Sequence, residues 1–460
     1  MIYNEVSIAG AGQAYYFKST GGQAPIMKKP NLLLIHPSPD KDRVRSRRRK
    51  KSSMAQLNLP ILAAHADDRF DIRIVDENVE DIDFNFAADL VGISLMTATA
   101  VRGYEIADIF RGKGIKVVLG GMHVFFMPDE ASPHADAILI GEAEYSWNDL
   151  LDDFLAGRLK KIYRSEKLHD LKGLPRPRLD LLKKGAYSLA NVIETSRGCP
   201  HKCRYCAVTH FWGNRIRSRP VEEVIDEIKA MPPGDIVFID DNIFGQSKRA
   251  MELFEAMIPL KRGWVGQGDL RISRDPELLD LARRSGCKWL FIGLETLDLE
   301  NLEAMGKQRV NHLEDYEKSL SIIHRKGINI FGSFIFGLDN DDAGVFHRTL
   351  QFCTRNRLEC ANFYILTPFP GTQLFDSMKA DKRLIHHNWS RYDANHVVFK
   401  PLKMTEDELI EGYIKAYRLF YSIGSIARRI LGRRRDFWHI LAVNIGRRLK
   451  FRYFQEGCRS

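Results

Sequence analysis

The first 160 residues alternate short apolar runs with stretches of helical character. The apolar runs are short and nearly continuous, and they span residues 31–35, 72–75, 90–94, 116–120 and 137–140. Runs of this kind are typical of parallel strands that are buried on both faces of a sheet. Helical patterns at 98–111 and 145–157 lie between and after them. This order predicts a doubly wound, Rossmann-like α/β domain over residues 30–157, with its ligands at the carboxyl ends of the strands.

A second alternation begins at residue 192. Strand patterns recur six times, at 192–195, 236–239, 264–268, 289–293, 329–336 and 362–366, with helical segments between them. Six such units predict a partial (β/α)6 barrel of the TIM type over residues 192–380, in which the chemistry gathers at the C-terminal ends of the strands. The stretch 158–191 lacks periodicity and contains Pro175 and Pro177, which predicts a strap connecting the two domains.

The remaining segments complete the expected organisation. Residues 1–29 form an N-terminal extension that matches no pattern, and residues 425–460 form a basic tail. Between the barrel and the tail, residues 381–424 should be a helical C-terminal subdomain. Its main helix has an N-terminal capping box made by Thr405 and Glu408.

Composition excludes several classes of protein. With 44% hydrophobic and 28% charged residues in a chain of 460, the sequence is that of a soluble globular protein with more than one domain. It contains no apolar run long enough to span a membrane, and its first residues do not resemble a secretory signal, so we expect a cytoplasmic protein. Seven cysteines in that compartment favour metal or redox chemistry over disulfides.

The formal charge of +10 is unevenly distributed. Residues 41–51 sum to +7 and residues 424–460 to +8, so the rest of the chain sums to −5. In the tail, basic pairs and triplets alternate with aromatic and aliphatic residues, which is typical of an amphipathic helix on an anionic membrane. RNA binding and a solvated helix packed on the protein are the alternatives. The aromatic residues favour membrane contact through 425–460, and nucleic acid is an unlikely partner.

Three of the seven cysteines lie in the sequence ETSRGCPHKCRYC, as Cys199, Cys203 and Cys206. They follow the first predicted barrel strand directly, so the loop lies at the catalytic end of the barrel. A structural zinc ion needs four ligands, which His201 or His210 could complete. An iron–sulfur cubane held by only three thiolates would instead keep one iron open for a ligand. The other four cysteines are scattered and are expected to be small buried hydrophobes or, for Cys458, part of the tail.

The C-x3-C-x2-C spacing, with Tyr205 before the third cysteine, resembles the radical S-adenosylmethionine (SAM) enzymes. In that family the three cysteines hold a [4Fe-4S] cluster whose free iron binds the amino and carboxylate groups of SAM. The resemblance continues in FIDDN, IGLET, GSFIFG and LTPFPGT, which end the second, fourth, fifth and sixth strands. It implies that SAM is bound by Tyr205, by Asp240 or Asp241 at the amino group in place of the family's Gly-Gly-Glu, by Glu295 at the ribose, and by Gly332 and Gly337 at the adenine.

Residues 90–147 resemble the cobalamin-binding domain of B12-dependent radical SAM enzymes, including a Gly-Gly pair and the sequence GEAE. The implied cobalamin-binding residues are Ser94, Thr97, Gly120, Gly121, His123, Gly141 and Glu142. The Asp-x-His-x-x-Gly loop of other cobalamin domains is absent, so His36 is not expected to bind cobalt. The alternative is a domain that has lost cobalamin. No cysteine precedes Cys199, which excludes the second cluster of the methylthiotransferases.

These resemblances imply an enzyme that cleaves SAM to form a 5′-deoxyadenosyl radical and functionalises an unactivated carbon, most often by methyl transfer. Ring formation or rearrangement, as in the anaerobic porphyrin-ring cyclase, and a radical SAM enzyme with a vacant B12 domain are the alternatives. A non-enzymatic cobalamin or iron–sulfur module is the remaining one. The expected partners are a small-molecule or lipid-like substrate and an external electron donor such as a flavodoxin or ferredoxin.

Overall fold

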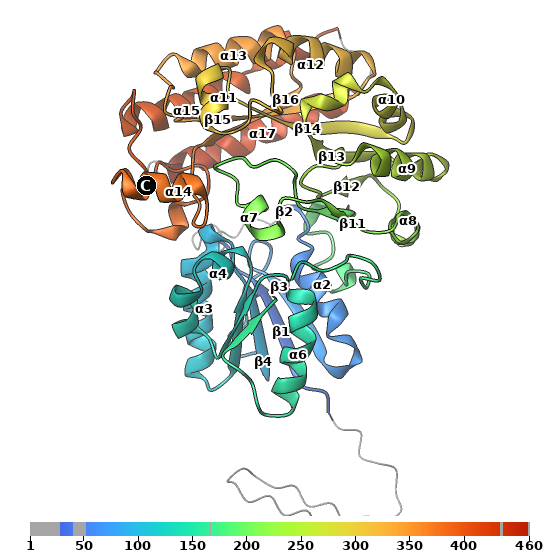
Figure 1. Ribbon diagram of the computed structural model, residues 1–460, viewed down its shortest axis with the longest axis vertical. Coiled ribbons are helices and arrows are strands. Elements are labelled where there is room, and N and C mark those ends of the chain that lie inside the picture. The colour runs from blue at the N-terminus through green and yellow to red at the C-terminus, as the bar shows by residue number, and fades with distance from the viewer. Residues whose placement is uncertain (1–27, 40–51, 166, 433–435, 459–460) are drawn as a thin grey trace, which may run out of the picture.

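The computed structural model describes residues 28–39, 52–165, 167–432 and 436–458, and it stacks two α/β units end to end (Figure 1). The basic run at 41–51 lies outside the described residues, as does nearly all of the N-terminal extension. In the view of Figure 1, the first unit lies below and the second, larger unit above, with the cysteine loop between them.

The first unit is built on one parallel sheet of six strands in the order β3-β1-β4-β5-β6-β7. The strands are β1 (Asn31–His36), β3 (Asp71–Asp76), β4 (Leu90–Ser94), β5 (Lys116–Gly120), β6 (Ala137–Ile140) and β7 (Ile162–Arg164). Five of them match the predicted apolar runs. The sixth, β7, pairs with β6 and lies in the stretch expected to be a strap. Only Tyr163 of the three residues of β7 is buried. The sequence therefore has no apolar run from which this strand could be predicted.

Helices cover both faces of this sheet, as a doubly wound fold requires. On one face, α2 (Asn58–His65) and α6 (Ala143–Leu155) pack Leu59 and Trp147 against the even-numbered side chains of β1. On the other, α3 (Ala100–Gly112) and α4 (Met122–Phe126) pack against the odd-numbered ones. A short α5 (Pro128–Ala131) follows α4. The strand β2 (Ser52–Met54) leaves the domain and pairs with β8 (Tyr187–Leu189) of the strap.

The second unit is a curved parallel sheet with strand order β9-β12-β13-β14-β15-β16. Its strands are β9 (Val192–Ile193), β12 (Ile236–Phe238), β13 (Trp264–Gly268), β14 (Cys287–Glu295), β15 (Asn329–Phe336) and β16 (Cys360–Ile365). The outer helices are α8 (Val221–Ala230), α9 (Ser247–Met257), α10 (Pro276–Arg284), α12 (Tyr316–Arg325) and α13 (Val345–Arg355). The six predicted β/α units are therefore present. The first is split, since Ser196–Arg197 form a separate strand, β10, paired with β11 (Arg217–Ser218).

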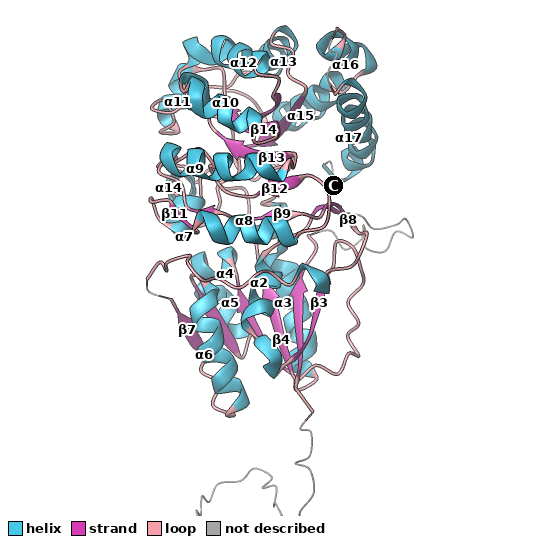
Figure 2. Ribbon diagram, turned by 90° about the vertical axis from the view of Figure 1, so that its right-hand side faces the viewer, coloured by secondary structure: helices cyan, strands magenta, loops and turns pink. Residues whose placement is uncertain are grey.

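The C-terminal helices pack against the barrel. After α14 (Gln373–Ala380), helix α15 (Glu406–Phe420) begins at the predicted capping box, in which Thr405 Oγ1 accepts a hydrogen bond from the Glu408 N–H. Helices α16 (Ile423–Ile430) and α17 (Phe437–Cys458) follow. They bury Ile426, Ile430 and Ile440 against Trp289 and Cys360 of the barrel strands. Figure 2 shows α16 and α17 together along one side of the barrel.

The sequence prediction of a Rossmann-like domain, a partial barrel and a helical C-terminal region is thus confirmed. Three of the scattered cysteines, Cys287, Cys353 and Cys360, are fully buried, as expected of small hydrophobes. Within the described part of the chain, none of the helices combines the length and the apolar character needed to cross a membrane.

Candidate functional site

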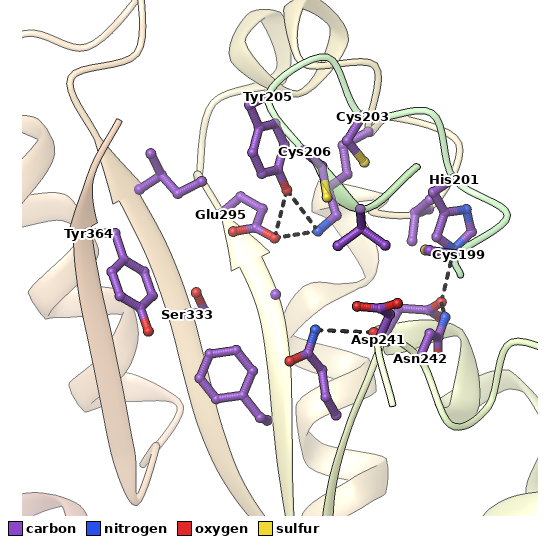
Figure 3. Close-up of a pocket in the computed structure, with 18 of the residues that line it drawn as sticks. Cys199, His201, Cys203, Tyr205, Cys206, Asp241, Asn242, Glu295, Ser333 and Tyr364 are labelled. Atoms are coloured by element: carbon purple, nitrogen blue, oxygen red, sulfur yellow. Dashed lines mark hydrogen bonds and ion pairs between the residues drawn. The ribbon is translucent and has the colours of Figure 1, made fainter. Parts of the chain in front are cut away.

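The three clustered cysteines line a cavity of about 330 Å³ at the C-terminal ends of the barrel strands (Figure 3). Cys199, Cys203 and Cys206 come from the loop between β10 and a short helix, α7 (Val208–Trp212). The opposite wall is formed by side chains at the ends of β14, β15 and β16, including Glu295. Chemistry at this end is a property of the β/α architecture, because the loops after the strands meet there.

Glu295 is held in place by two neighbours. Its Oε1 accepts a hydrogen bond from the Tyr205 hydroxyl at 3.1 Å and forms an ion pair with Lys307. The backbone of Glu295 is left-handed, with φ 67°, at a break in the register between β14 and β15. This folds the carboxylate back over Gly293, where a Cβ would lie 2.3 Å from Glu295 Oε1. Backbone strain of this kind is typical of functional sites.

The two aspartates of FIDDN have different surroundings. Asp241 and the next residue, Asn242, line the cavity, and burial raises the pKa of Asp241 to about 6. Asp240 lies outside the cavity, where it accepts hydrogen bonds from Thr195 and Ser196 at 2.6–2.7 Å. Of the two aspartates predicted to contact SAM, only Asp241 lines the cavity, and Asp240 holds the start of the cysteine loop.

The two predicted adenine contacts, Gly332 and Gly337, are not among the residues that line the cavity. A Cβ on Gly332 would touch Leu358 and Leu294 at 3.0–3.3 Å, so this glycine serves close packing on the outer side of β15. Gly337 has φ 89° and donates its N–H to Asp341 in the turn after the strand. The alternate residues Ser333 and Ile335 face the cavity instead.

The thiols fit an iron–sulfur cluster better than a single zinc ion. Among the described residues, no group of three or more His, Cys, Asp or Glu side chains is close enough to hold one metal ion. His201 is engaged elsewhere, with its Nε2 3.2 Å from Asp269 and 3.0 Å from Arg271. A cubane spreads its thiolate ligands around several irons, and iron sites of this type take cysteine almost exclusively.

Burial raises the pKa of the Cys199 thiol to about 11 and that of Cys206 to about 12. At neutral pH both side chains are therefore protonated in the protein alone, and metal binding must displace these protons. Thiols whose pKa is raised in this way are poor nucleophiles, which argues against a role for these cysteines as catalytic nucleophiles. The donor set and its enclosure fit a resident metal cluster.

A second cavity, of about 400 Å³, lies between the two units. The first domain contributes the carboxyl-end residues Ser94, Gly120, Gly121, Gly141 and Glu142, all predicted to bind cobalamin. The barrel contributes Glu194, Ser196, Arg197, Phe211 and Trp212. Asp241 lines both cavities, so the two adjoin one another. Gly121 makes the close backbone approach possible, because a Cβ there would lie 2.7 Å from Leu95 O.

A buried cluster of ion pairs crosses the boundary between the units at this cavity. Arg197, only 3% exposed, pairs with Glu144 of the first domain and with Glu194 at 2.8 Å. Arg217 donates to Glu142 at 3.0 Å. Burial alone would raise the pKa of Glu144, but the Arg197 guanidinium outweighs it and holds that pKa below its usual value.

Arg197 is shared by two carboxylates, the buried Glu144 and the partly buried Glu194, and its charge is not enough to keep both of them ionised. Burial outweighs the attraction of Arg197 and raises the pKa of Glu194 to about 7. Glu194 and Arg197 flank Thr195 and Ser196, and Arg197 precedes the first cysteine by two residues. The wall of the second cavity and the root of the cysteine loop are therefore the same short segment.

Two predicted cobalamin contacts lie away from this cavity. Thr97 is buried in a short helical turn. His123 is fully buried, with its Nε2 3.4 Å from Glu130, which also accepts a hydrogen bond from the Trp389 indole at 2.8 Å. His123 thus joins the first domain to the segment after the barrel. His123, one of the implied cobalamin-binding residues, therefore does not line the second cavity.

The residues present fit cobalamin at the second cavity. A corrin ring needs a broad apolar surface with a few polar groups, and Leu57, Leu59 and Ile61 of the α2 region line the cavity beside Trp212. His36 also lines it, and its Nδ1 is buried without a hydrogen-bond partner among the described residues. Burial lowers the pKa of His36, so the ring is neutral and can accept or donate one hydrogen bond.

Sequence reasoning missed several residues of the first cavity. Lys307 follows α11 (Leu299–Ala304) and reaches Glu295 from a loop with no motif. Tyr364 of β16 lines the cavity and accepts a hydrogen bond from Asn362 at 2.8 Å, and Asn362 in turn accepts one from Arg447 of α17 at 2.7 Å. Single residues of this kind carry no spacing signal, although alternation along β16 places Asn362 and Tyr364 on one face.

Comparison with family models gives two matches. Residues 50–151 match the B12 binding domain, and residues 193–353 match the radical SAM superfamily. The two matched regions contain the second cavity's Rossmann edge and the three cysteines respectively.

Comparison with individual proteins agrees. The chain is 34% identical, over 82% of its length and 85% of the relative's, to bacteriochlorophyllide d C-12(1)-methyltransferase of Chlorobaculum tepidum. It is 26% identical, over 66% of its length and 55% of the relative's, to the anaerobic magnesium-protoporphyrin IX monomethyl ester cyclase of Cereibacter sphaeroides. Its fold is similar to that of the cobalamin-dependent SAM radical enzyme OxsB, with a TM-score of 0.68 at 16% identity, covering 92% of this chain and 72% of that one.

The chain therefore belongs to the cobalamin-dependent radical SAM enzymes, with a B12-binding domain followed by a radical SAM domain. The cofactors of this class are a [4Fe-4S] cluster, SAM and cobalamin, as the sequence predicted. The protein is an enzyme, and the non-enzymatic alternative is set aside.

Proposed function

We propose that the enzyme transfers a methyl group to an unactivated carbon of an amphiphilic small molecule. The observation that carries this proposal is the contact between the two cavities at Asp241, because methyl transfer to carbon needs the cobalamin and SAM sites to share one substrate. When bound, the cluster and SAM supply removal of hydrogen from carbon, and cobalamin supplies a methyl group. The 34% identity to a methyltransferase acting on bacteriochlorophyllide d supports the same reaction.

The chain's own residues would divide the work as follows. Cys199, Cys203 and Cys206 hold the cluster, and Glu295, fixed by Tyr205 and Lys307, orients SAM through its ribose. A carboxylate already held in place loses little conformational freedom when the ligand binds.

The first cavity, which the three cysteines line, is called the cluster cavity from here on, and its walls select the acceptor. Phe291, Ile335, Leu366 and Phe369 line it, so its exposed surface is mostly apolar, and a bound acceptor would displace water from beside the reacting groups. Such a lining suits an apolar or amphiphilic acceptor better than a strongly polar one.

A methyl-label experiment tests the reaction. The reduced holoenzyme would be incubated with SAM labelled in its methyl group and with a chlorophyllide or a terpenoid lipid as acceptor. We expect label in the acceptor and formation of 5′-deoxyadenosine. An altered acceptor without label would contradict methyl transfer.

Ring formation is the second candidate, and the similarity to the magnesium-protoporphyrin IX monomethyl ester cyclase favours it. Both reactions use the same cavities, so the label experiment separates them. A product with fewer hydrogens and no labelled methyl group would identify the cyclase reaction.

We also propose that the enzyme is cytoplasmic, takes electrons from a flavodoxin or ferredoxin, and works at the membrane surface through residues 425–460. The excess positive charge of the chain supports both partners, since these donors and inner-leaflet lipids are acidic. Formation of 5′-deoxyadenosine with a reduced flavodoxin in place of a chemical reductant tests the donor.

A further inference from the structure

Exposed apolar side chains concentrate at the C-terminal end of the chain. Of the seventeen large apolar side chains that are exposed in the described residues, six fall within the 31 residues from 419 to 449. They are Leu419, Ile423, Leu431, Trp438, Ile445 and Leu449. A soluble surface tolerates such residues singly, whereas a cluster marks an interaction surface.

Helix α17 is apolar on two opposite faces. Its inner face carries Ile440 and Phe451, which are buried against the barrel and α15. Its outer face carries Trp438, 77% exposed, with Ile445 and Leu449 seven and eleven positions later, which places all three on one stripe. The outer stripe is therefore apolar surface that remains exposed although the opposite face of the helix is already packed.

The inner sides of α16 and α17 are already packed against the rest of the protein, as the contacts of two arginines show. Arg429 is fully buried and donates hydrogen bonds to the carbonyl oxygens of Leu358, Glu359 and Phe420. Arg447 donates to Asn362 of β16. These contacts fix α16 and α17 on the barrel, so the outer stripe is presented on a rigid support along the side seen in Figure 2.

The surroundings of the stripe are basic. Among the described residues, Arg428 of α16 and Lys450 of α17 are exposed, and the sequence of 424–460 as a whole is basic. A stripe with an exposed tryptophan and a basic margin matches the interfacial region of an anionic bilayer, where aromatic rings settle at headgroup depth and cations meet lipid phosphates.

We propose that the outer face of α16 and α17 docks on an anionic lipid bilayer, with Trp438, Ile445 and Leu449 entering the headgroup region. This deepens the proposed function by assigning the membrane contact to one face of the tail. It rests on that function only for the amphiphilic nature of the acceptor, and binding to lipid does not require catalysis.

Vesicle sedimentation of the full-length holoenzyme tests the proposal. The vesicles would contain phosphatidylcholine alone or phosphatidylcholine mixed with phosphatidylglycerol. The wild type should sediment with the mixed vesicles, and less so with phosphatidylcholine or at high salt, because salt screens the basic margin. The triple variant W438S/I445S/L449S should lose about tenfold or more in apparent affinity.

The triple variant must keep its fold for this result to count. Its iron and cobalt content and its formation of 5′-deoxyadenosine should equal those of the wild type. Leu299→Ser, which removes an exposed apolar side chain from the barrel, is the matched control and should bind like the wild type.

Three results would overturn the proposal. They are equal sedimentation of the wild type and the triple variant, no sedimentation of the wild type with mixed vesicles, and a wild-type dimer that the triple variant converts to a monomer without any vesicle binding. The last would assign the stripe to a second copy of the chain. Loss of methyl transfer with vesicle binding intact would count against the proposed function alone.

Discussion

The two cavities differ in how the chain builds them. The cluster cavity is lined by the second unit alone, and its three cysteines lie within eight residues of one loop. The second cavity is shared by two domains, and its walls combine glycines of the Rossmann edge with Glu194 and Arg197 from the root of the cysteine loop. A ligand held by a few specific side chains is thus encoded locally, whereas a large ligand held by surfaces is encoded across the fold.

The largest expected effect is on the cluster cavity. Cys203→Ala should reduce bound iron from about four per chain to nearly none and abolish 5′-deoxyadenosine formation, because two thiolates do not hold a cubane. Cobalamin binding should remain, since Cys203 does not line the second cavity. Iron, sulfide and cobalt analysis measures both. Cys353→Ala, a buried cysteine outside both cavities, is the control and should keep its iron.

The next largest effect is expected at both cavities together. Arg197→Met leaves Glu144 and Glu194 buried without their cation, which typically costs about 3–5 kcal/mol of folding free energy. Chemical denaturation should show this loss, with lower occupancy of cobalamin and cluster together. Arg178→Met removes the exposed pair with Asp180 and should cost at most about 1 kcal/mol. Loss of cluster with full cobalamin binding would show that the two sites are independent.

A smaller effect should be confined to the binding of SAM. Lys307→Met removes the cation that holds Glu295, and one charge-assisted hydrogen bond contributes about 1.5–3 kcal/mol. The dissociation constant for SAM, measured by calorimetry on the cluster-loaded protein, should rise about tenfold or more. Lys326→Met, which breaks an exposed pair with Asp280, should leave it unchanged. An unchanged constant in Lys307→Met would remove Glu295 from the SAM site.

The smallest effect is a pH dependence of stability at the second cavity. The pKa of Glu194 is raised from 4.5 to about 7 in the folded protein, so the folded state binds this proton more tightly than the unfolded state. The stability it provides is complete below about pH 4.5 and is lost as the pH rises to about 7. Glu194→Gln should remove this pH dependence of the folding free energy, which amounts to about 1–3 kcal/mol between about pH 4.5 and about pH 7. Denaturation curves at pH 5 and pH 8 for the wild type and the variant measure it. An equal change in folding free energy in the two proteins would contradict a raised pKa of Glu194.

The difference between the cavities also explains what could be predicted from the sequence. The strands of both sheets were predictable because parallel strands need apolar residues on both faces, and only β7, with one buried residue, escaped. The cysteine loop and Glu295 could be placed from spacing and from strand ends. Lys307 could not, since it arrives from a loop without a motif.

The predicted residues of the first domain that do not line the second cavity have the same explanation. Ser94 and Gly121 could be placed because they end strands, whereas His123 lies one position into α4 and turns into the core beside Glu130 and Trp389. Its hydrogen-bond partner Glu130 is close in the chain, but Trp389, which also bonds to Glu130, is 266 residues away from His123. No local pattern indicates that second contact.

The central claim is that one chain holds two cofactors in adjoining cavities. The most direct test is to purify the protein without oxygen from cells supplied with cobalamin and to count iron, sulfide and cobalt per chain. The account predicts about four irons, about four sulfides and one cobalt. A full complement of iron and sulfide without cobalt would contradict it and would leave methyl transfer to unactivated carbon without its methyl carrier.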